Sequence, residues 1–319
     1  MQPNHLLVDN LWTDTEQYAI SIIREFFTDS RLSQELVIHY SLWNRRKANL
    51  DLLPILVLEP NSLNYNIIIS LVVAWQILQC SARIFDDIED DDTGCKPTDI
   101  NIGTSFLLLA QQVIFKLEAY GISKDQTRLI ITKYNQIVFE ACSGQHDDLL
   151  GQSQKLEITP EIWLDIAYRK SGALFSWATW VGPFLANVDT EIIQNYGEFA
   201  RFLGALIQVT DDLNDTWKTS NSGLIKSDLV SLAYVYGKFV ATPKVCQQIE
   251  EWSGFKNNPI QSKKEIQNLL LNLGAQKYLF AAALIQKQKA LESIQKNLPS
   301  TNLQNLMELI NEIFPDFPC

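Results

Sequence analysis

The sequence predicts an all-α protein that folds as a single domain over residues 1–319. Thirteen Gly and eleven Pro are few for 319 residues, which disfavours a turn-rich β fold and favours long helices. Apolar residues recur at the three- and four-residue spacing of a helix face through most of the chain. No low-complexity linker and no internal repeat interrupts this pattern. One helical barrel or bundle is therefore the expected architecture.

The helices can be placed from their start signals and from the breaks between them. We expect the first helix to begin at Thr13, because Thr13 and Glu16 have the spacing of a capping box. After a break at 61–66, a long apolar helix is expected to run into the acidic cluster at 86–92. Further helices are expected at 33–43, 102–120, 125–151, 160–186, 191–219, 227–238, 261–296 and 301–313.

Composition excludes several classes of protein. The formal net charge of -11 would repel phosphate backbones, so nucleic acid is not expected as a partner. The five Cys are odd in number and none has metal-ligand spacing, which favours a reducing cytoplasm over a disulfide scaffold. The most apolar run, at 67–78, is twelve residues long and too short to span a bilayer. We therefore expect a cytoplasmic protein without a membrane span.

Two acidic clusters of the form Asp-Asp-x-x-Asp carry most of the functional information. On a helix the first and last Asp of this pattern lie on one face, where like charges repel by about 0.2–0.5 kcal/mol per pair at an exposed surface. Each cluster also ends an apolar helix, where the helix dipole disfavours anions. Their members are Asp86, Asp87 and Asp90 in the first cluster and Asp211, Asp212 and Asp215 in the second.

Carboxylates that cost stability in this way suggest a site for hard cations. Mg²⁺ is bound by one or two carboxylates and completes its shell with water and substrate phosphates. Two facing clusters would hold Mg²⁺ and one diphosphate, and the metal would neutralise charge on the departing group. The alternative is a solvated acidic helix end, which is the usual meaning of a single acidic run. Two copies favour the metal site.

With these clusters the sequence resembles the trans-isoprenyl diphosphate synthase (polyprenyl synthetase) family over most of its length. Shorter motifs add to the resemblance: Asn101-Ile102-Gly103, Gly144-Gln145, Lys170-Ser171-Gly172-Ala173-Leu174-Phe175, and Gln208 ahead of the second cluster. The resemblance implies the helical fold of the isoprenoid synthases, three Mg²⁺ ions held by the six aspartates, and a homodimer.

The resemblance also implies which side chains contact the diphosphate. Lys170 would pair with it and Gln208 would lie near it, on the helical face of Asp211. Lys226 is a further candidate, with a solvent-facing Lys as the alternative. Arg83 lies one turn before the first cluster, where an ion pair within the helix is preferred to a diphosphate contact.

Residues before the first cluster set the depth of the prenyl pocket in this family. Phe85, Ser81 and Ala82 occupy these positions, and the small Ser81 and Ala82 favour a substrate of fifteen or twenty carbons. Trp177 and Trp180 lie one turn apart on an apolar helix. The face of a Trp stabilises a cation by about 0.5–2 kcal/mol, although core packing is the alternative for each of them.

The sequence departs from the chain-elongating members of the family at their second phosphate site. Those members bind isopentenyl diphosphate with a basic segment and an Arg pair. Here the segment at 48–56 keeps the Pro and the apolar residues without the basic ones, and 92–98 has no Arg pair. Arg45, Arg46 and Lys47 lie nearby but out of register. Because a diphosphate without metal needs Arg or Lys donors, isopentenyl diphosphate is not expected to bind.

These observations predict a class I terpene synthase, which ionises an allylic prenyl diphosphate and lets the cation cyclise. One alternative is transfer of the prenyl group to another acceptor, as in the bacterial enzymes that modify a peptide tryptophan. A second is chain elongation with a rebuilt site. A third is a regulatory subunit without catalysis, which both intact clusters disfavour.

Overall fold

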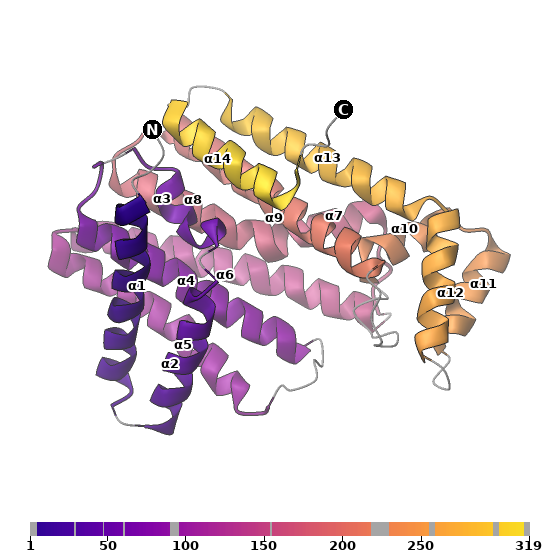
Figure 1. The fold of residues 1–319 in the computed structure, drawn as a ribbon, viewed down its shortest axis with the longest axis horizontal. Helices are drawn as coiled ribbons and strands as arrows, with labels where there is room; N and C mark the ends of the chain where they lie inside the picture. The colour runs from indigo at the N-terminus through magenta and orange to yellow at the C-terminus, as the bar shows by residue number, and fades with distance from the viewer. Residues whose placement is uncertain are drawn as a thin grey trace. The chain divides into compact units, whose positions relative to one another are not determined.

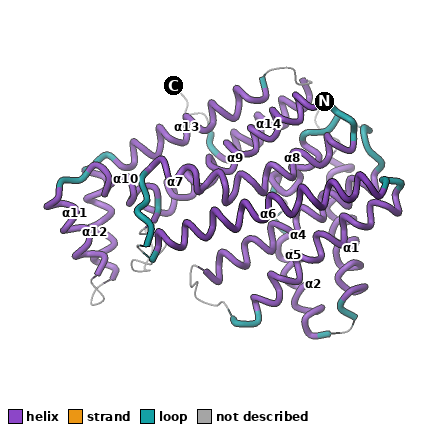
Figure 2. The backbone as a smooth tube through the Cα atoms, turned by 180° about the vertical axis from the view of Figure 1, so that it is seen from behind, coloured by secondary structure: helices purple, strands orange, loops and turns teal. Residues whose placement is uncertain are grey.

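The computed structural model describes residues 5–28, 30–46, 48–59, 61–89, 96–153, 155–217, 230–254, 259–295 and 300–315. Its regular secondary structure within these ranges is helical throughout, as Figures 1 and 2 show, and this confirms the all-α prediction. The elements are α1 (His5–Phe26), α2 (Arg31–Asn44), η1 (Asn49–Leu52), α3 (Leu53–Leu56), α4 (Tyr65–Glu89), α5 (Asp99–Phe115), η2 (Lys116–Tyr120), α6 (Lys124–Gln152), α7 (Pro160–Ala167), η3 (Tyr168–Gly172), α8 (Ala173–Leu185), α9 (Thr190–Thr216), α10 (Leu232–Val240), α11 (Pro243–Gly254), α12 (Pro259–Asn272), α13 (Ala275–Ile294) and α14 (Ser300–Ile313).

The predicted helices differ from the observed ones in several details, and the short elements η1 and α3 were not expected. Thr13 lies inside α1, which begins at His5, so Thr13 and Glu16 do not form a capping box at its start. The expected helix at 261–296 is two helices, because Gly274 takes a left-handed conformation with φ of 83° and separates α12 from α13. Helix α11 was not expected, although Thr242 followed by Pro243 is a start signal for a helix.

The Cα positions group into two compact units, each made of three stretches of the chain. Unit 1 comprises Met1–Gln136, Trp177–Tyr196 and Leu298–Leu309. Unit 2 comprises the intervening stretches, and α6, α8, α9 and α14 each supply residues to both units. The single domain stays a prediction.

Helix α4 is the core helix of unit 1. It packs against α5, α1 and α2, and its residues from Ile69 to Ser81 are all buried. Among the described residues, α4 and the segment Asp99–Tyr120 are long and apolar enough to cross a membrane. In α4, 78% of the most apolar window is buried, as is typical of a core helix. In Asp99–Tyr120, 50% of the most apolar window is buried.

Glycines bring three helical segments of unit 2 into close contact. A Cβ atom added at Gly204 of α9 would lie 2.5 Å from the backbone N of Gly172, and one at Gly144 of α6 would lie 2.6 Å from the backbone N of Lys170. Side chains do not fit at these distances, so only Gly allows α6 and α9 to approach η3 this closely. The backbone of Lys170 is thereby fixed by packing.

Candidate functional site

The second aspartate cluster lies near the C-terminal end of α9, in unit 2. The carboxylate of Asp212 accepts a hydrogen bond from the backbone N–H of Leu232, at the first residue of α10. Removal from water raises the pKa of Asp212 to about 8, against the opposing effect of the Leu232 hydrogen bond. The carboxylates of Asp148 and Asp211 raise the pKa further, and the Lys170 ammonium lowers it. Burial is thus the main cause of the raised pKa, and the neighbouring carboxylates add to it.

Lys170 lies in η3, a single π-helical turn between α7 and α8. Its Nζ is 3.1 Å from Oδ2 of Asp148 on α6, and the two side chains are only 20% and 16% exposed. Turns of this kind are frequent at functional sites, because they displace one side chain from the regular helical position. The structure thus brings Lys170 and Asp212 of the second cluster into one electrostatic group, whereas a contact of Lys170 with a diphosphate stays a prediction. Gln208 lies half-buried on α9, one turn before Asp212, and Asp215 is exposed near the end of α9.

Sequence reasoning missed the acidic partners of the π-helical turn. Arg169 is held by two carboxylates: its NH1 atom is 2.9 Å from Oδ2 of Asp147, and its Nε is 2.8 Å from Oδ2 of Asp165. A third, longer contact of 3.3 Å joins NH1 to the hydroxyl of Ser143. The signal was present in the pair Asp147-Asp148 directly after Gly144-Gln145-His146, although its partners could not be read from the sequence.

The first aspartate cluster ends α4, in unit 1. Asp86 and Asp87 are described, whereas Asp90 and the predicted diphosphate contact Lys226 lie outside the described residues. Arg83 Nε is 2.7 Å from Asp87 Oδ1, four residues further along the helix. This is the ion pair within the helix that the sequence favoured for Arg83.

The residues before the first cluster face α5. The hydroxyl of Ser81 donates to the carbonyl of Gly103 at 2.8 Å, and the ring of Phe85 lies against Gly103, where an added Cβ would be 3.1 Å from the ring edge. Ala82 is half-buried. Ser81 and Phe85 thus hold α4 to α5, whereas a role in pocket depth stays a prediction.

The two tryptophans proposed for a cavity wall make aromatic contacts in unit 1. Trp177 is fully buried and meets Tyr134 edge-to-face, with ring centroids 5.7 Å apart. Trp180 stacks on Phe184 at 4.5 Å between centroids. Trp177 therefore makes the core contact that was its alternative explanation.

A buried acid occupies the segment where the family has its basic residues. Asp51 in η1 is fully buried and accepts a hydrogen bond from Gln79 Nε2 at 3.2 Å. Burial raises the pKa of Asp51 to about 6, and the nearby Arg46 guanidinium acts in the opposite direction. Arg46 lies 3.5 Å from Asp51 Oδ1 and 3.4 Å from the centroid of the Trp43 ring. The charge of Arg46 is thus balanced by Asp51.

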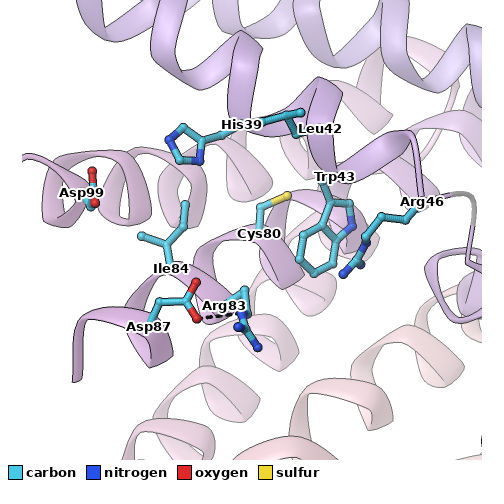
Figure 3. Close-up of a pocket in the computed structure, with 9 residues that line it drawn as sticks. All are labelled: His39, Leu42, Trp43, Arg46, Cys80, Arg83, Ile84, Asp87 and Asp99. Atoms are coloured by element: carbon cyan, nitrogen blue, oxygen red, sulfur yellow. Dashed lines mark ion pairs between the residues drawn. The ribbon is translucent and has the colours of Figure 1, made fainter. Parts of the chain in front are cut away.

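A pocket of about 300 Å³ lies between α2, α4 and the start of α5, all in unit 1 (Figure 3). It includes Asp87 of the first cluster, so it lies directly beside that cluster. Both of its guanidinium groups are ion-paired, Arg83 with Asp87 and Arg46 with Asp51. Its polar lining is His39, Arg46, Arg83, Asp87 and Asp99.

The donor set of unit 2 fits a hard divalent cation. Within the described ranges no three His, Cys, Asp or Glu side chains meet at one point within a single metal shell. Burial is the main cause of the raised pKa of Asp212, and the nearby carboxylates of Asp148 and Asp211 add to it. Oxygen ligands with unbalanced negative charge suit Mg²⁺, which needs few protein ligands when a phosphate completes its shell.

Comparison with known proteins identifies the family. A family model described as polyprenyl synthetase matches residues 43–270, well over half of the chain. The chain therefore belongs to the polyprenyl synthetase family. It is similar to a short chain isoprenyl diphosphate synthase of Methanothermobacter thermautotrophicus, 25% identical over 54% of this chain and 52% of that protein. The match thus spans about half the length of this relative.

Two further similarities bear on fold and chemistry. Tryptophan prenyltransferase ComQ of Bacillus subtilis is 25% identical over 69% of this chain and 72% of its own length. A geranylgeranyl pyrophosphate synthase from Corynebacterium glutamicum, solved with isoprenyl diphosphate and magnesium, matches with a TM-score of 0.78 at 15% identity, over 96% of this chain and 98% of that one. At that identity the structural match establishes the fold alone, and it confirms the isoprenoid synthase fold expected from the sequence.

Proposed function

We propose that this protein ionises an allylic prenyl diphosphate of fifteen carbons or more in the presence of Mg²⁺, and that the resulting cation does not react with isopentenyl diphosphate. The observation that carries this proposal is the group around Lys170, which brings one ammonium next to Asp148 and into electrostatic contact with Asp212 of the second cluster. Such a group suits a diphosphate that arrives with its own cations.

Each residue of this group would have a distinct task. Lys170 would bind a diphosphate oxygen in exchange for Asp148, at a mostly buried position where a charged hydrogen bond is strong. The aspartates of both clusters would hold Mg²⁺, which when bound neutralises the charge on a leaving diphosphate. The ring of contacts around Arg169 and the glycine packing would keep Lys170 in place.

The first fate proposed for the cation is cyclisation, which would make the protein a class I terpene synthase. The buried Asp51 supports it, because a carboxylate paired with Gln79 and Arg46 now occupies the segment that would otherwise offer basic residues to a second diphosphate. Without a second substrate, the double bonds of the prenyl chain are the nearest nucleophiles.

The second proposed fate is transfer to an acceptor other than isopentenyl diphosphate. The similarity to ComQ favours it, since that match covers more of both chains than the match to the archaeal synthase. In such a transfer the allylic C–O bond breaks with its electron pair leaving on the diphosphate. A bond then forms from the allylic carbon to a ring carbon of the acceptor, and the ring proton is lost to solvent.

Product analysis would test both fates. Purified protein is incubated with Mg²⁺ and farnesyl or geranylgeranyl diphosphate, alone, with isopentenyl diphosphate, or with a tryptophan-containing peptide. Hydrocarbon or terpene alcohol from the diphosphate alone supports cyclisation, and peptide-dependent turnover supports transfer. Longer prenyl diphosphates would establish elongation, and the absence of turnover in every arm would favour a regulatory subunit.

We also propose that the protein is a cytoplasmic homodimer. Helix α5 exposes Ile100, Leu108 and Phe115 at 50%, 56% and 47%, and their spacing of eight and seven residues places them along one face. An exposed apolar strip of this kind is typical of a subunit interface. Light scattering on the purified chain would measure the oligomeric state, and a monomer at micromolar concentration would contradict the proposal.

A further inference from the structure

The pocket beside the first aspartate cluster has a lining unlike that of a phosphate site. Its walls combine apolar side chains from two helices, Leu42 and Trp43 from α2 with Cys80 and Ile84 from α4. Figure 3 shows Trp43 and Cys80 on one side of Ile84, and Asp99 on the other. The apolar side chains thus lie between Arg46 at one end of the pocket and Asp99 at the other.

The charges of the pocket disfavour a diphosphate. Arg83 and Arg46, the two guanidinium groups, are each ion-paired with a carboxylate at 2.7 Å and 3.5 Å. Asp99 adds a further acid, whose Oδ2 accepts the backbone N–H of Lys96. A diphosphate would have to displace these carboxylates and lose its hydration without a net positive charge to compensate.

The same features suit a neutral aromatic ring that carries one N–H donor. The volume of about 300 Å³ is at the lower end of the range for small-molecule sites, and it accommodates a bicyclic ring. The ring would pack on Leu42, Cys80 and Ile84, while the carboxylate of Asp99 offers an acceptor for its N–H.

We infer that this pocket binds the indole ring of an acceptor, from free tryptophan or from a tryptophan side chain in a peptide. The inference rests on the proposed transfer to an acceptor. It places the acceptor in a pocket whose lining includes Asp87 of the first cluster. The ring enters past Leu42, which is 56% exposed at the rim.

Binding can be measured directly on the full chain, without Mg²⁺ or prenyl diphosphate. The probes are N-acetyltryptophanamide, free tryptophan and isopentenyl diphosphate. Their binding is measured by calorimetry or saturation-transfer NMR. N-acetyltryptophanamide should bind saturably, and preference between the first two probes distinguishes a peptide acceptor from the free amino acid. Absence of saturable binding by both tryptophan probes, or displacement of N-acetyltryptophanamide by isopentenyl diphosphate, would overturn the inference.

A matched pair of variants on α2 locates the bound ring. Leu42→Glu should lower the affinity for N-acetyltryptophanamide by about tenfold or more, because the new carboxylate would lose hydrating water when the ring binds beside it. Ile38→Glu, one turn away at 57% exposure and outside the pocket, should change affinity by less than about twofold. Leu42→Asn, which adds no charge, should show a smaller loss than Leu42→Glu. Equal losses at Leu42 and Ile38 would contradict the inference.

The binding assay and the activity assay fail independently. A protein that releases pyrophosphate from farnesyl diphosphate with Mg²⁺ but binds neither tryptophan probe would overturn the pocket and leave ionisation standing. A protein that binds N-acetyltryptophanamide with the Leu42 dependence above, yet releases no pyrophosphate, would support the pocket and overturn the proposed ionisation.

Discussion

The surroundings of Lys170 in unit 2 and those of Arg46 and Arg83 in unit 1 differ in how charges are matched. Around Lys170 several carboxylates share one ammonium, and the pKa of Asp212 rises to about 8. Arg46 and Arg83, by contrast, each have a carboxylate partner of their own. The carboxylates of the first region would stabilise a bound cation, whereas an anion in the second would have to displace the carboxylate partners of Arg46 and Arg83. This contrast favours a metal-bound diphosphate over a second, metal-free one.

The largest expected effect comes from removing negative charge in unit 2. Asp212→Asn should lower Mg²⁺-dependent pyrophosphate release from farnesyl diphosphate by about 10²–10³-fold, because a proposed carboxylate ligand of Mg²⁺ is lost. Steady-state kinetics would measure it. Asp125→Asn, which removes an exposed carboxylate of α6, serves as the control. Wild-type activity in Asp212→Asn would mean that the carboxylate excess has no catalytic role.

The glycine packing that fixes Lys170 should be the next most sensitive feature. Gly204→Ala should lower the free energy of unfolding by about 1–3 kcal/mol, since its Cβ would overlap the backbone of Gly172. Gly197→Ala, on the same helix with no atom within 4 Å of the added Cβ, should instead raise it by about 0.5–1 kcal/mol. Urea unfolding of both variants tests the opposite signs. A loss in both would argue against close packing at Gly204 as the cause.

A smaller effect is expected from the two ion pairs of Arg169, next to Lys170. Arg169→Lys should lower the free energy of unfolding by about 1 kcal/mol, because a lysine lacks the separate Nε and NH1 donors that contact Asp165 and Asp147. If Arg169 positions Lys170, the KM for farnesyl diphosphate should rise more than kcat falls. Arg128→Lys, at an exposed position of α6, should leave both parameters unchanged. Equal changes in the two variants would remove the positioning role.

The last prediction concerns the pH dependence of stability. The pKa of Asp212 is about 8 in the folded protein, against the ordinary value of 3.8 for an aspartate in an unfolded chain. Between these values the folded state keeps a proton that the unfolded state releases. Stability should therefore fall as pH rises from about 4 to 8. Asp51, with a pKa of about 6, acts in the same direction over a narrower range.

Comparison of two proteins isolates the contribution of Asp212. The fall in Tm between pH 5 and pH 8 should be smaller in Asp212→Asn than in the wild type, and Mg²⁺ should reduce the fall only in the wild type. Identical pH profiles of the Tm without metal would show that the pKa of Asp212 is not raised in the folded protein.

Local patterns in the sequence predicted much of this architecture, and tertiary contacts account for the rest. Helical periodicity and the spacing of the Asp-Asp-x-x-Asp clusters are local, so the all-α fold and the position of Asp212 could be predicted. The pairing of Asp51 with Gln79 joins residues 28 positions apart, and that of Lys170 with Asp148 joins residues 22 apart. No local pattern encodes such pairs. The break at Gly274 was missed for a different reason, since one Gly in a helical pattern does not by itself end a helix.

The most direct test of the charge contrast is equilibrium binding, measured by calorimetry on the wild-type protein. A non-reactive thiodiphosphate analogue of farnesyl diphosphate should bind with Mg²⁺ and lose most of its affinity when the metal is chelated, while isopentenyl diphosphate should show no saturable binding in either condition. Tight binding of isopentenyl diphosphate without metal would contradict the account, because Arg46 and Arg83 beside the first cluster are both ion-paired.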